Sequence, residues 1–200
     1  MRSRFLLPVV LALPGLALGA TGLLHPHTLT PATADRWYLI HLAGLVVFPL
    51  VGVALAALMR GRQDPVAWFV RLTAYGFAVF YTALDVIYGV AAGNVTRQME
   101  EGYRRSADFT AMLRTGVDLG EVGSWSLVVC GLALVVDQLG RHRLDGLPAL
   151  GLPIGGWLVH QDHIFAPTGV AGMLVVGLAT GLLARNLPKL AGNQVQPLAR

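Results

Sequence analysis

Residues 37–59 of the chain are WYLIHLAGLVVFPLVGVALAALM, an apolar run with one histidine and no charged side chain. A helix that crosses the hydrocarbon core of a membrane needs about 20 such residues, because each residue advances the helix by about 1.5 Å. Five further apolar runs follow the same pattern, so we predict an all-α, polytopic transmembrane helical bundle with six spans. The other runs are Leu6–Leu24, Val66–Ala92, Leu119–Leu139, Leu147–Val159 and Thr168–Ala184.

The composition also indicates a membrane protein. Of the 200 residues, 54% are apolar and only 13% are charged, whereas soluble domains have roughly 25% charged residues. With a mean hydropathy of +0.60, the chain is neither disordered nor a soluble globule. The net charge of +4 is scattered between apolar runs, which argues against nucleic acid as a partner. A single cysteine, Cys130, excludes an intramolecular disulfide framework and a thiolate metal cluster.

Two of the six spans have alternative interpretations. The fifth run, Leu147–Val159, is short and contains Pro148 and Pro153, so we expect this span to be tilted or re-entrant. The first run follows a basic start and includes the small residues Gly19 and Ala20, which resemble the cleavage site of a signal peptide. Cleavage would leave five spans, but the run is long enough to be retained as a helix.

Lysine and arginine predict the orientation, because they are enriched on the cytoplasmic side of membrane spans. With a cytoplasmic N-terminus, ten of the 15 Lys and Arg residues fall on the cytoplasmic side, including those of the short loops Arg60-Gly61-Arg62 and Arg141-His142-Arg143. We therefore predict a plasma-membrane protein with both termini in the cytoplasm. Residues 1–185 would form a single transmembrane domain, and residues 186–200 a short cytoplasmic tail.

The longest polar stretch, Gly93–Asp118, lies between the third and fourth spans. Within it, residues 97–114 place apolar side chains at helical spacing from Met99 to Leu113, while the charged side chains face elsewhere. This pattern predicts an amphipathic helix on the outer membrane surface. The simplest role for such a segment is a connector that caps the bundle, and the alternative is a lid over a substrate.

Ionisable side chains are costly inside a membrane, so each one within or at the rim of a span requires a partner or a function. In the predicted orientation, nearly all the histidines and several carboxylates fall at the outer ends of the spans. This shared depth is the most informative feature of the sequence, and it depends on the topology. The candidate metal ligands are His25, His27, His41, His160 and His163, and the candidate catalytic carboxylates are Asp85 and Glu121.

Each candidate also has a purely structural explanation. A lone histidine at the interface is more often a packing residue than a ligand, but three histidines within 17 residues strengthen the case for a site. If their segment is helical, His160 and His163 share one face at a spacing suited to chelation. Neighbouring tyrosines on the same helical face could hold Asp85, which could instead be a ligand or a general base. Glu121 lies in the first turns of the fourth span.

These residues support three hypotheses about function. In the first, imidazoles and a carboxylate bind a divalent transition metal (Zn, Cu or Fe), either for catalysis on a lipid-borne or extracytoplasmic small molecule or for metal handling. In the second, two histidines such as His41 and His160 hold a b-type haem for electron transfer. In the third, the protein lies in the lipid bilayer as a structural or partner subunit and has no chemistry of its own. Homo-oligomers and complexes with a partner subunit are left open.

Overall fold

The computed structural model describes residues 3–102 and 104–187, which form helices joined by short loops, with no strand among them. The predicted all-α architecture is therefore confirmed. The elements are α1 (Ser3–Gly22), α2 (Ala34–Ala57), α3 (Pro65–Leu84), the π-helix η1 (Asp85–Ala91), α4 (Ala92–Thr96), α5 (Ala107–His142), the 3-10 helix η2 (Arg143–Leu150), α6 (Gly151–Asp162), α7 (Thr168–Leu183) and the 3-10 helix η3 (Ala184–Asn186).

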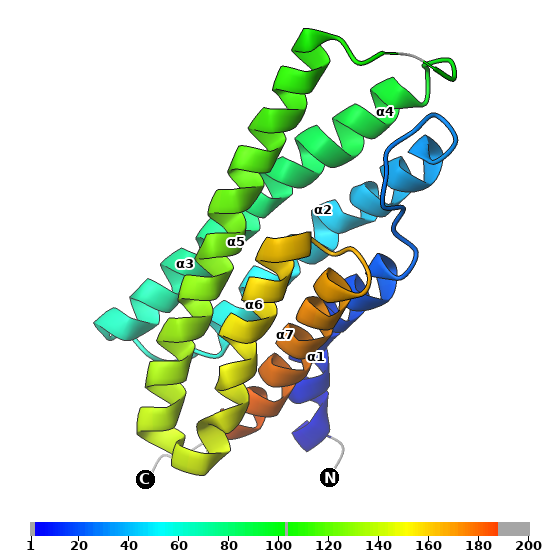
Figure 1. The fold of residues 1–200 in the computed structure, drawn as a ribbon. Coiled ribbons are helices and arrows are strands. Elements are labelled where there is room, and N and C mark those ends of the chain that lie inside the picture. Colours follow the sequence, from blue (N-terminus) through cyan, green and yellow to red (C-terminus); the bar gives the residue numbers. More distant parts are fainter. Residues whose placement is uncertain (1–2, 103, 188–200) are drawn as a thin grey trace, which may run out of the picture.

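Among the described residues, five helical stretches are long and apolar enough to cross a membrane. The fourth stretch contains two helices, because the chain turns at η2 and α6 runs back alongside α5 (Figure 1). The 12 residues of α6 rise by about 18 Å, against about 30 Å of hydrocarbon. The count of six spans, with a tilted or re-entrant fifth, therefore stays a prediction. The five stretches are Phe5–Gly22, Ala34–Ala57, Pro65–Thr96, Ala107–Asp162 and Thr168–Asn186.

The helices pack into one bundle (Figure 1). In it, α1 packs against α7 and α2, α3 packs against α5 and α2, and α6 packs against α5 and α7. The close approach of α1 to α7 depends on glycine, because a Cβ on Gly15 would lie only 2.7 Å from Cα of Gly177. Small residues at such crossings let two helix backbones come together, as is common in membrane bundles.

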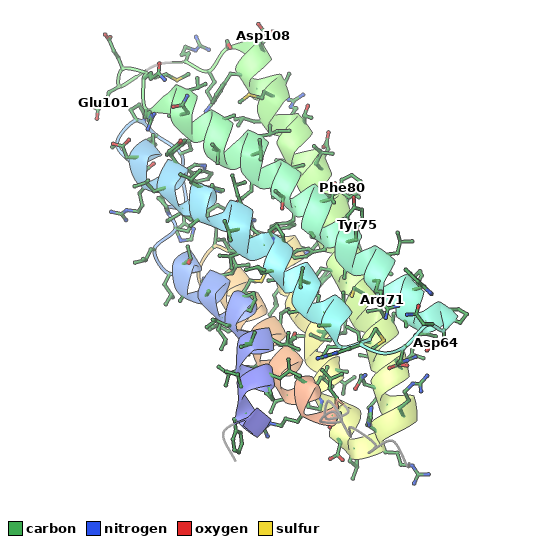
Figure 2. All side chains as sticks on the ribbon, turned by 180° about the vertical axis from the view of Figure 1, so that it is seen from behind. Asp64, Arg71, Tyr75, Phe80, Glu101 and Asp108 are labelled. Carbon is green, nitrogen blue, oxygen red and sulfur yellow. The ribbon has the colours of Figure 1, made fainter. Side chains whose placement is uncertain are left out.

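The bundle is apolar both inside and outside. Large side chains such as Phe48, Phe77 and Leu127 are fully buried in its interior. Many others remain exposed, among them Leu72 and Tyr75, and Figure 2 shows Tyr75 on the outward side of α3. Soluble proteins rarely expose extensive apolar surface, whereas lipid chains are as apolar as these side chains. The exterior therefore agrees with the membrane location that the composition predicts.

Charged side chains pair with one another at the end of the bundle where α2 meets α3. Arg62 donates to Asp137 at 2.7 Å and to Asp64 at 2.8 Å, and Arg141 donates to Asp137 at 2.9 Å. The hydrogen bonds to Asp64 and Asp137 raise the pKa of Arg62, and the same guanidinium holds the pKa of Asp64 well below its usual range. Asp137, although buried, is thus explained as the centre of a structural ion-pair network.

The predicted amphipathic helix over residues 97–114 is wrong in extent, because α5 begins only at Ala107 and the described residues before it form turns and irregular structure. Two local features account for the difference. Gly102 has φ of +84°, a conformation that glycine adopts without strain. Ser106 caps α5, its hydroxyl accepting a hydrogen bond from the main-chain N–H of Phe109 at 3.1 Å. From there α5 continues unbroken through the run predicted as the fourth span.

Candidate metal centre

Three histidines from distant parts of the chain meet inside the bundle, at the level where α1 and α6 end (Figure 1). His25 lies in the loop after α1, His41 lies near the start of α2, and His163 directly follows α6. One ring nitrogen of each lies within 4.8 Å of the other two, which is close enough for the three to hold a metal ion. His25 and His41 are buried and His163 is half-buried. These three residues are called the histidine cluster below.

The loop that carries His25 also orients its ring. Nδ1 of His25 donates to the main-chain carbonyl of Pro26 at 2.7 Å. The ring packs edge-on against Trp37 and Phe165, with centroids 4.7 and 4.6 Å away. Because a carbonyl can only accept, the hydrogen of the neutral imidazole is on Nδ1 and the free lone pair is on Nε2. His25 therefore offers Nε2 to the cluster.

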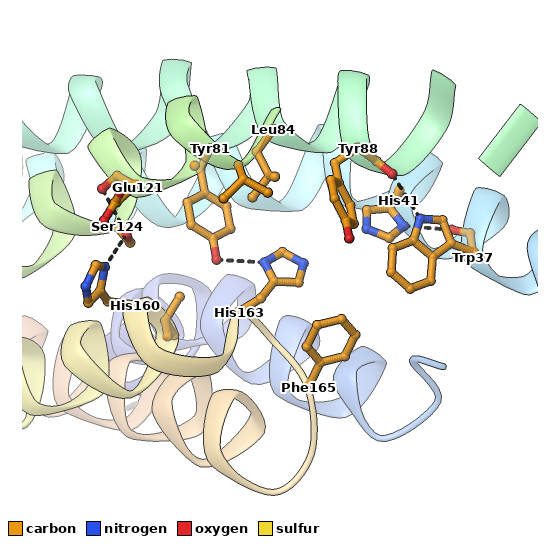
Figure 3. A pocket seen from close by; sticks show the side chains of 13 residues that line it. Trp37, His41, Tyr81, Leu84, Tyr88, Glu121, Ser124, His160, His163 and Phe165 are labelled. Carbon is orange, nitrogen blue, oxygen red and sulfur yellow. Dashed lines mark hydrogen bonds between the residues drawn. The ribbon is translucent and has the colours of Figure 1, made fainter. Parts of the chain in front are cut away.

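His41 has the same arrangement on α2. Its Nδ1 donates to the carbonyl of Trp37 at 2.7 Å, and the indole N–H of Trp37 donates to the carbonyl of Tyr88 in η1 at 3.2 Å (Figure 3). The ring of His41 lies against Gly89, where a Cβ would overlap it. Glycine at position 89 therefore allows η1 to pack directly against the part of α2 that carries His41.

His163 reaches the cluster from the end of α6. As the cap of that helix it has φ of 50° and ψ of −131°, a combination that is rare outside glycine. Its Nδ1 lies 2.7 Å from the hydroxyl of Tyr81 on α3 (Figure 3). This hydrogen bond occupies Nδ1 and leaves Nε2 for the cluster, where the ring lies parallel to that of His41 with centroids 6.0 Å apart.

The protonation of the cluster favours metal ions over protons. The Nε2 atoms of His25 and His41 lie 3.4 Å apart, and in the neutral rings neither carries a hydrogen, so two lone pairs face each other. A proton between them is disfavoured, because burial lowers the pKa of His25 to about 4. Burial also lowers the pKa of His163 well below its ordinary value. Neutral imidazoles are the form that binds metal ions.

Asp85 adds a buried carboxylate beside the cluster. It is the first residue of the π-helix η1, a rare type of turn that frequently marks functional sites. Its Oδ1 lies 3.8 Å from Nε2 of His41, and neither of its oxygens has a hydrogen-bond partner among the described residues. A Cβ on Gly44 would overlap Oδ2, so glycine in α2 makes room for this carboxylate. A buried, unpartnered carboxylate is costly when it is ionised, and either a proton or a nearby cation offsets that cost.

A cavity of about 390 Å³ opens beside the cluster. Figure 3 shows His41 at one end of it, His163 in the middle and His160 at the other end. Apolar side chains such as Leu84 and Val159 form much of the wall between these polar groups. A mostly apolar pocket of this size with a few polar groups is typical of small-molecule sites.

His160, which the sequence paired with His163, lies apart from the cluster. Its Nδ1 is 3.0 Å from Oγ of Ser124, and its ring packs against Trp125 and Trp157, with centroids 4.8 and 5.3 Å away. In a continuous helix, His160 and His163 would share one face. The helix ends before His163, and the positive φ of His163 turns its side chain away from that face. The two histidines thus line different parts of the same cavity.

Glu121 and His27 also lie outside the described cluster. Glu121 is exposed and lines the cavity, and His27 is exposed and stacks on Phe165 with centroids 5.5 Å apart. From its place near the end of a span, Trp37 is predicted only as an anchor at the membrane interface, and Tyr81 only as a partner of Asp85. The spacing of Tyr81 and Asp85 on one helical face indicated that Tyr81 lies near the candidate site. No sequence pattern indicated that main-chain carbonyls would orient two of the imidazoles.

The chain was compared with protein-family models, with curated proteins and with solved structures, and none of the three comparisons finds a match.

Proposed function

We propose that His25, His41 and His163 hold a divalent transition metal ion, and that this ion serves a membrane-embedded enzyme acting on a lipid-borne or extracytoplasmic substrate. The observation that carries the proposal is the convergence of three imidazoles whose Nδ1 atoms already make hydrogen bonds. Metal-binding histidines usually have such a bond on the second nitrogen, because it orients the ring and selects the tautomer. Asp85 then supplies a negative charge and serves as a fourth ligand or as a general base.

The separation of one pair of imidazoles suits a tetrahedral ion. Two nitrogens on a tetrahedral zinc ion, each bonded at about 2.0–2.1 Å, lie about 3.4 Å apart. The Nε2 atoms of His25 and His41 have that separation, 3.4 Å. Zinc, copper and iron all accept imidazole and carboxylate ligands. Three protein ligands leave a position for water or substrate, and a bound ion would lower the pKa of that water and polarise a carbonyl oxygen. The cavity beside His163 supports a catalytic use of this open position.

The ring packing favours a single ion over the alternative of a b-type haem. Two axial imidazoles bind haem iron from opposite faces of a flat macrocycle, so the macrocycle needs free space between the rings. The rings of His25 and His41 are in edge contact, with centroids 4.8 Å apart, and His163 approaches both. His160, the other haem ligand considered from the sequence, lies at the far end of the cavity (Figure 3).

The proposed membrane arrangement has six spans in the plasma membrane, both termini in the cytoplasm, and the histidine cluster at the outer face. Packing of α1 against α7 supports retention of α1 as the first span. Single cysteines in a Cys130→Ser background test the orientation. An impermeant maleimide should label Thr28→Cys in intact cells, but Gly61→Cys only after the membrane is permeabilised, and the reverse labelling would overturn the arrangement.

Metal analysis of the purified protein tests the site. Wild-type protein in detergent should contain close to one equivalent of a transition metal by mass spectrometry and release it to a chelator. In His163→Ala the metal affinity should fall by more than about 100-fold. Removing a residue that only supports a ligand lowers affinity by up to that factor, and loss of a ligand itself should lower it further. The matched control is His27→Ala, which removes an exposed imidazole near the cluster and should retain the metal.

Two outcomes would contradict this proposal. One is wild-type protein that neither contains a stoichiometric metal nor takes one up at neutral pH. The other is equal metal content in His163→Ala and wild type. In either case the cluster would be a packing arrangement, and the protein a structural or partner subunit.

A further inference from the structure

The cavity beside the histidine cluster opens sideways through the bundle. Val117 and Glu121 both lie on α5 and line the cavity, and both are exposed on the outer surface. In the proposed membrane arrangement this surface faces lipid near the outer rim of the bilayer. A molecule dissolved in the membrane could therefore enter the cavity without passing through water.

A groove on the lipid-facing surface begins where the cavity opens. Glu121 lines both, and the groove, of about 530 Å³, lies between α3 and α5 and extends along α5 from Asp118 to Val129. That part of α5 rises by about 16 Å, close to the roughly 15 Å of hydrocarbon in one leaflet. Phe69 and Trp125 are exposed in the groove. Its length and apolar side chains suit one hydrocarbon chain lying along the bundle.

The charged groups around the opening are carboxylates, which accept hydrogen bonds. Among the described residues that line the cavity and the groove, Asp118 and Glu121 are the carboxylates, and none is Lys or Arg. The hydroxyl of Ser124 donates to the carbonyl of Glu121 at 3.0 Å, so it accepts from Nδ1 of His160 and leaves Nε2 of that ring as an acceptor. At the opening, the carboxylates of Asp118 and Glu121 repel an anionic head group and can accept hydrogen bonds from a head group with N–H or O–H donors.

We propose that the cavity and the groove bind a single-chain amphiphile from the bilayer, with a head group that carries hydrogen-bond donors and no negative charge. The hydrocarbon chain lies in the groove between α3 and α5, and the head group passes Glu121 into the cavity, toward His163. This inference names the substrate class of the metal centre and therefore rests on the proposed function for its catalytic meaning.

Spin-labelled amphiphiles of equal chain length test the inference. Octadecylamine, a monoacylglycerol and octadecanoate, each with a nitroxide on the chain, are titrated into the protein in nanodiscs and followed by electron paramagnetic resonance. The amine and the monoacylglycerol should give a saturable immobilised component, and the carboxylate should bind at least tenfold more weakly. Equal binding of all three probes, or an immobilised component that does not saturate, would overturn the inference.

Two variants locate the bound probe. Glu121→Gln should weaken binding of the amine by about tenfold, as expected for the loss of one charge-assisted hydrogen bond. Val122→Trp should fill the groove and abolish the immobilised component, whereas Val136→Trp, an equally large change at an exposed position of α5 outside the groove, should leave it unchanged. Unaltered binding in Val122→Trp would contradict the assigned position.

Metal content measured on the same samples separates the two proposals. Glu121→Gln and Val122→Trp should keep the full complement of metal, because neither residue belongs to the histidine cluster. Wild-type protein that binds the amine but holds no metal would contradict the metal centre alone. Protein that holds the metal but binds no amphiphile would contradict only the substrate class.

Discussion

The hydroxyl of Tyr81 lies 2.7 Å from Nδ1 of His163, and this contact joins residues that are 82 positions apart in the chain. Tyr81 is buried on α3, so the hydrogen bond connects the helix before Asp85 to the residue that follows α6. Within residues 3–102 and 104–187, no other side-chain hydroxyl bonds to a ring nitrogen of the cluster, since the Nδ1 atoms of His25 and His41 bond to main-chain carbonyls. The orientation of His163 can therefore be changed without touching a ligand.

Tyr81→Phe should lower metal affinity by about 10- to 100-fold, the usual effect of removing a hydrogen bond to a metal-binding histidine. Competition titration with a chromophoric chelator measures the change. Tyr75→Phe removes a hydroxyl from an exposed position of the same helix and should leave affinity unchanged. Identical affinities for Tyr81→Phe and wild type would show that this hydrogen bond does not orient a ligand.

Gly89→Ala should displace the ring of His41, because the added Cβ would overlap it. We expect a loss of about 1–3 kcal/mol in the free energy of unfolding, as for other overpacked sites, together with loss of metal. Gly140→Ala is the matched control, since its Cβ meets no atom within 4 Å and α5 is helical there. The free energy of unfolding, measured by denaturation in detergent, and the metal content are compared between the two variants. Equal stability and full metal content in both would refute the prediction.

Asp85→Asn should affect the metal and not the fold. In metal-free protein the free energy of unfolding should stay the same or rise, because the substitution removes a buried negative charge that has no hydrogen-bond partner among the described residues. Metal affinity should fall at least about tenfold, because the negative charge nearest to His41 is removed. A variant that is much less stable without metal, with unchanged affinity, would instead make Asp85 a structural residue.

Metal-free protein should lose stability as the pH falls from 6.5 toward 4. The pKa of His25 is about 4 in the folded protein and 6.5 in the unfolded chain, so within this window the unfolded state binds the additional proton. One such group contributes up to about 3 kcal/mol to the free energy of unfolding, present above pH 6.5 and lost as the pH falls. The lowered pKa of His163 acts in the same direction.

Melting temperatures of chelator-treated protein across this window measure the effect. His25→Gln should show a shallower pH dependence than wild type, because one titrating group has been removed. His27→Gln, at an exposed position two residues later, should keep the wild-type dependence. A wild-type melting temperature that is constant between pH 6.5 and 4 would contradict the burial of neutral imidazoles.

Local patterns predicted much of the fold. The run Trp37–Met59 lies almost entirely in α2, and the turn at Arg141-His142-Arg143 lies where α5 ends and η2 begins. The prediction failed at residues 97–114, where hydrophobic spacing alone suggested a helix that Gly102 and Ser106 interrupt. Both interrupting residues are visible in the sequence, as a glycine and a capping serine, and at this place these local signals outweigh the hydrophobic periodicity.

The sequence by itself determined that apolar helices form and that histidines and carboxylates gather near one end of them, because hydropathy and helix length are local properties of the chain. Only the tertiary structure decided which histidines meet. His25 converges with His41 and His163 because the loop after α1 and the positive φ at His163 direct their rings inward, whereas His160 turns toward Ser124. Ring direction depends on how each helix is rotated and on where its neighbours leave room, and neither is encoded in the spacing of residues along the chain.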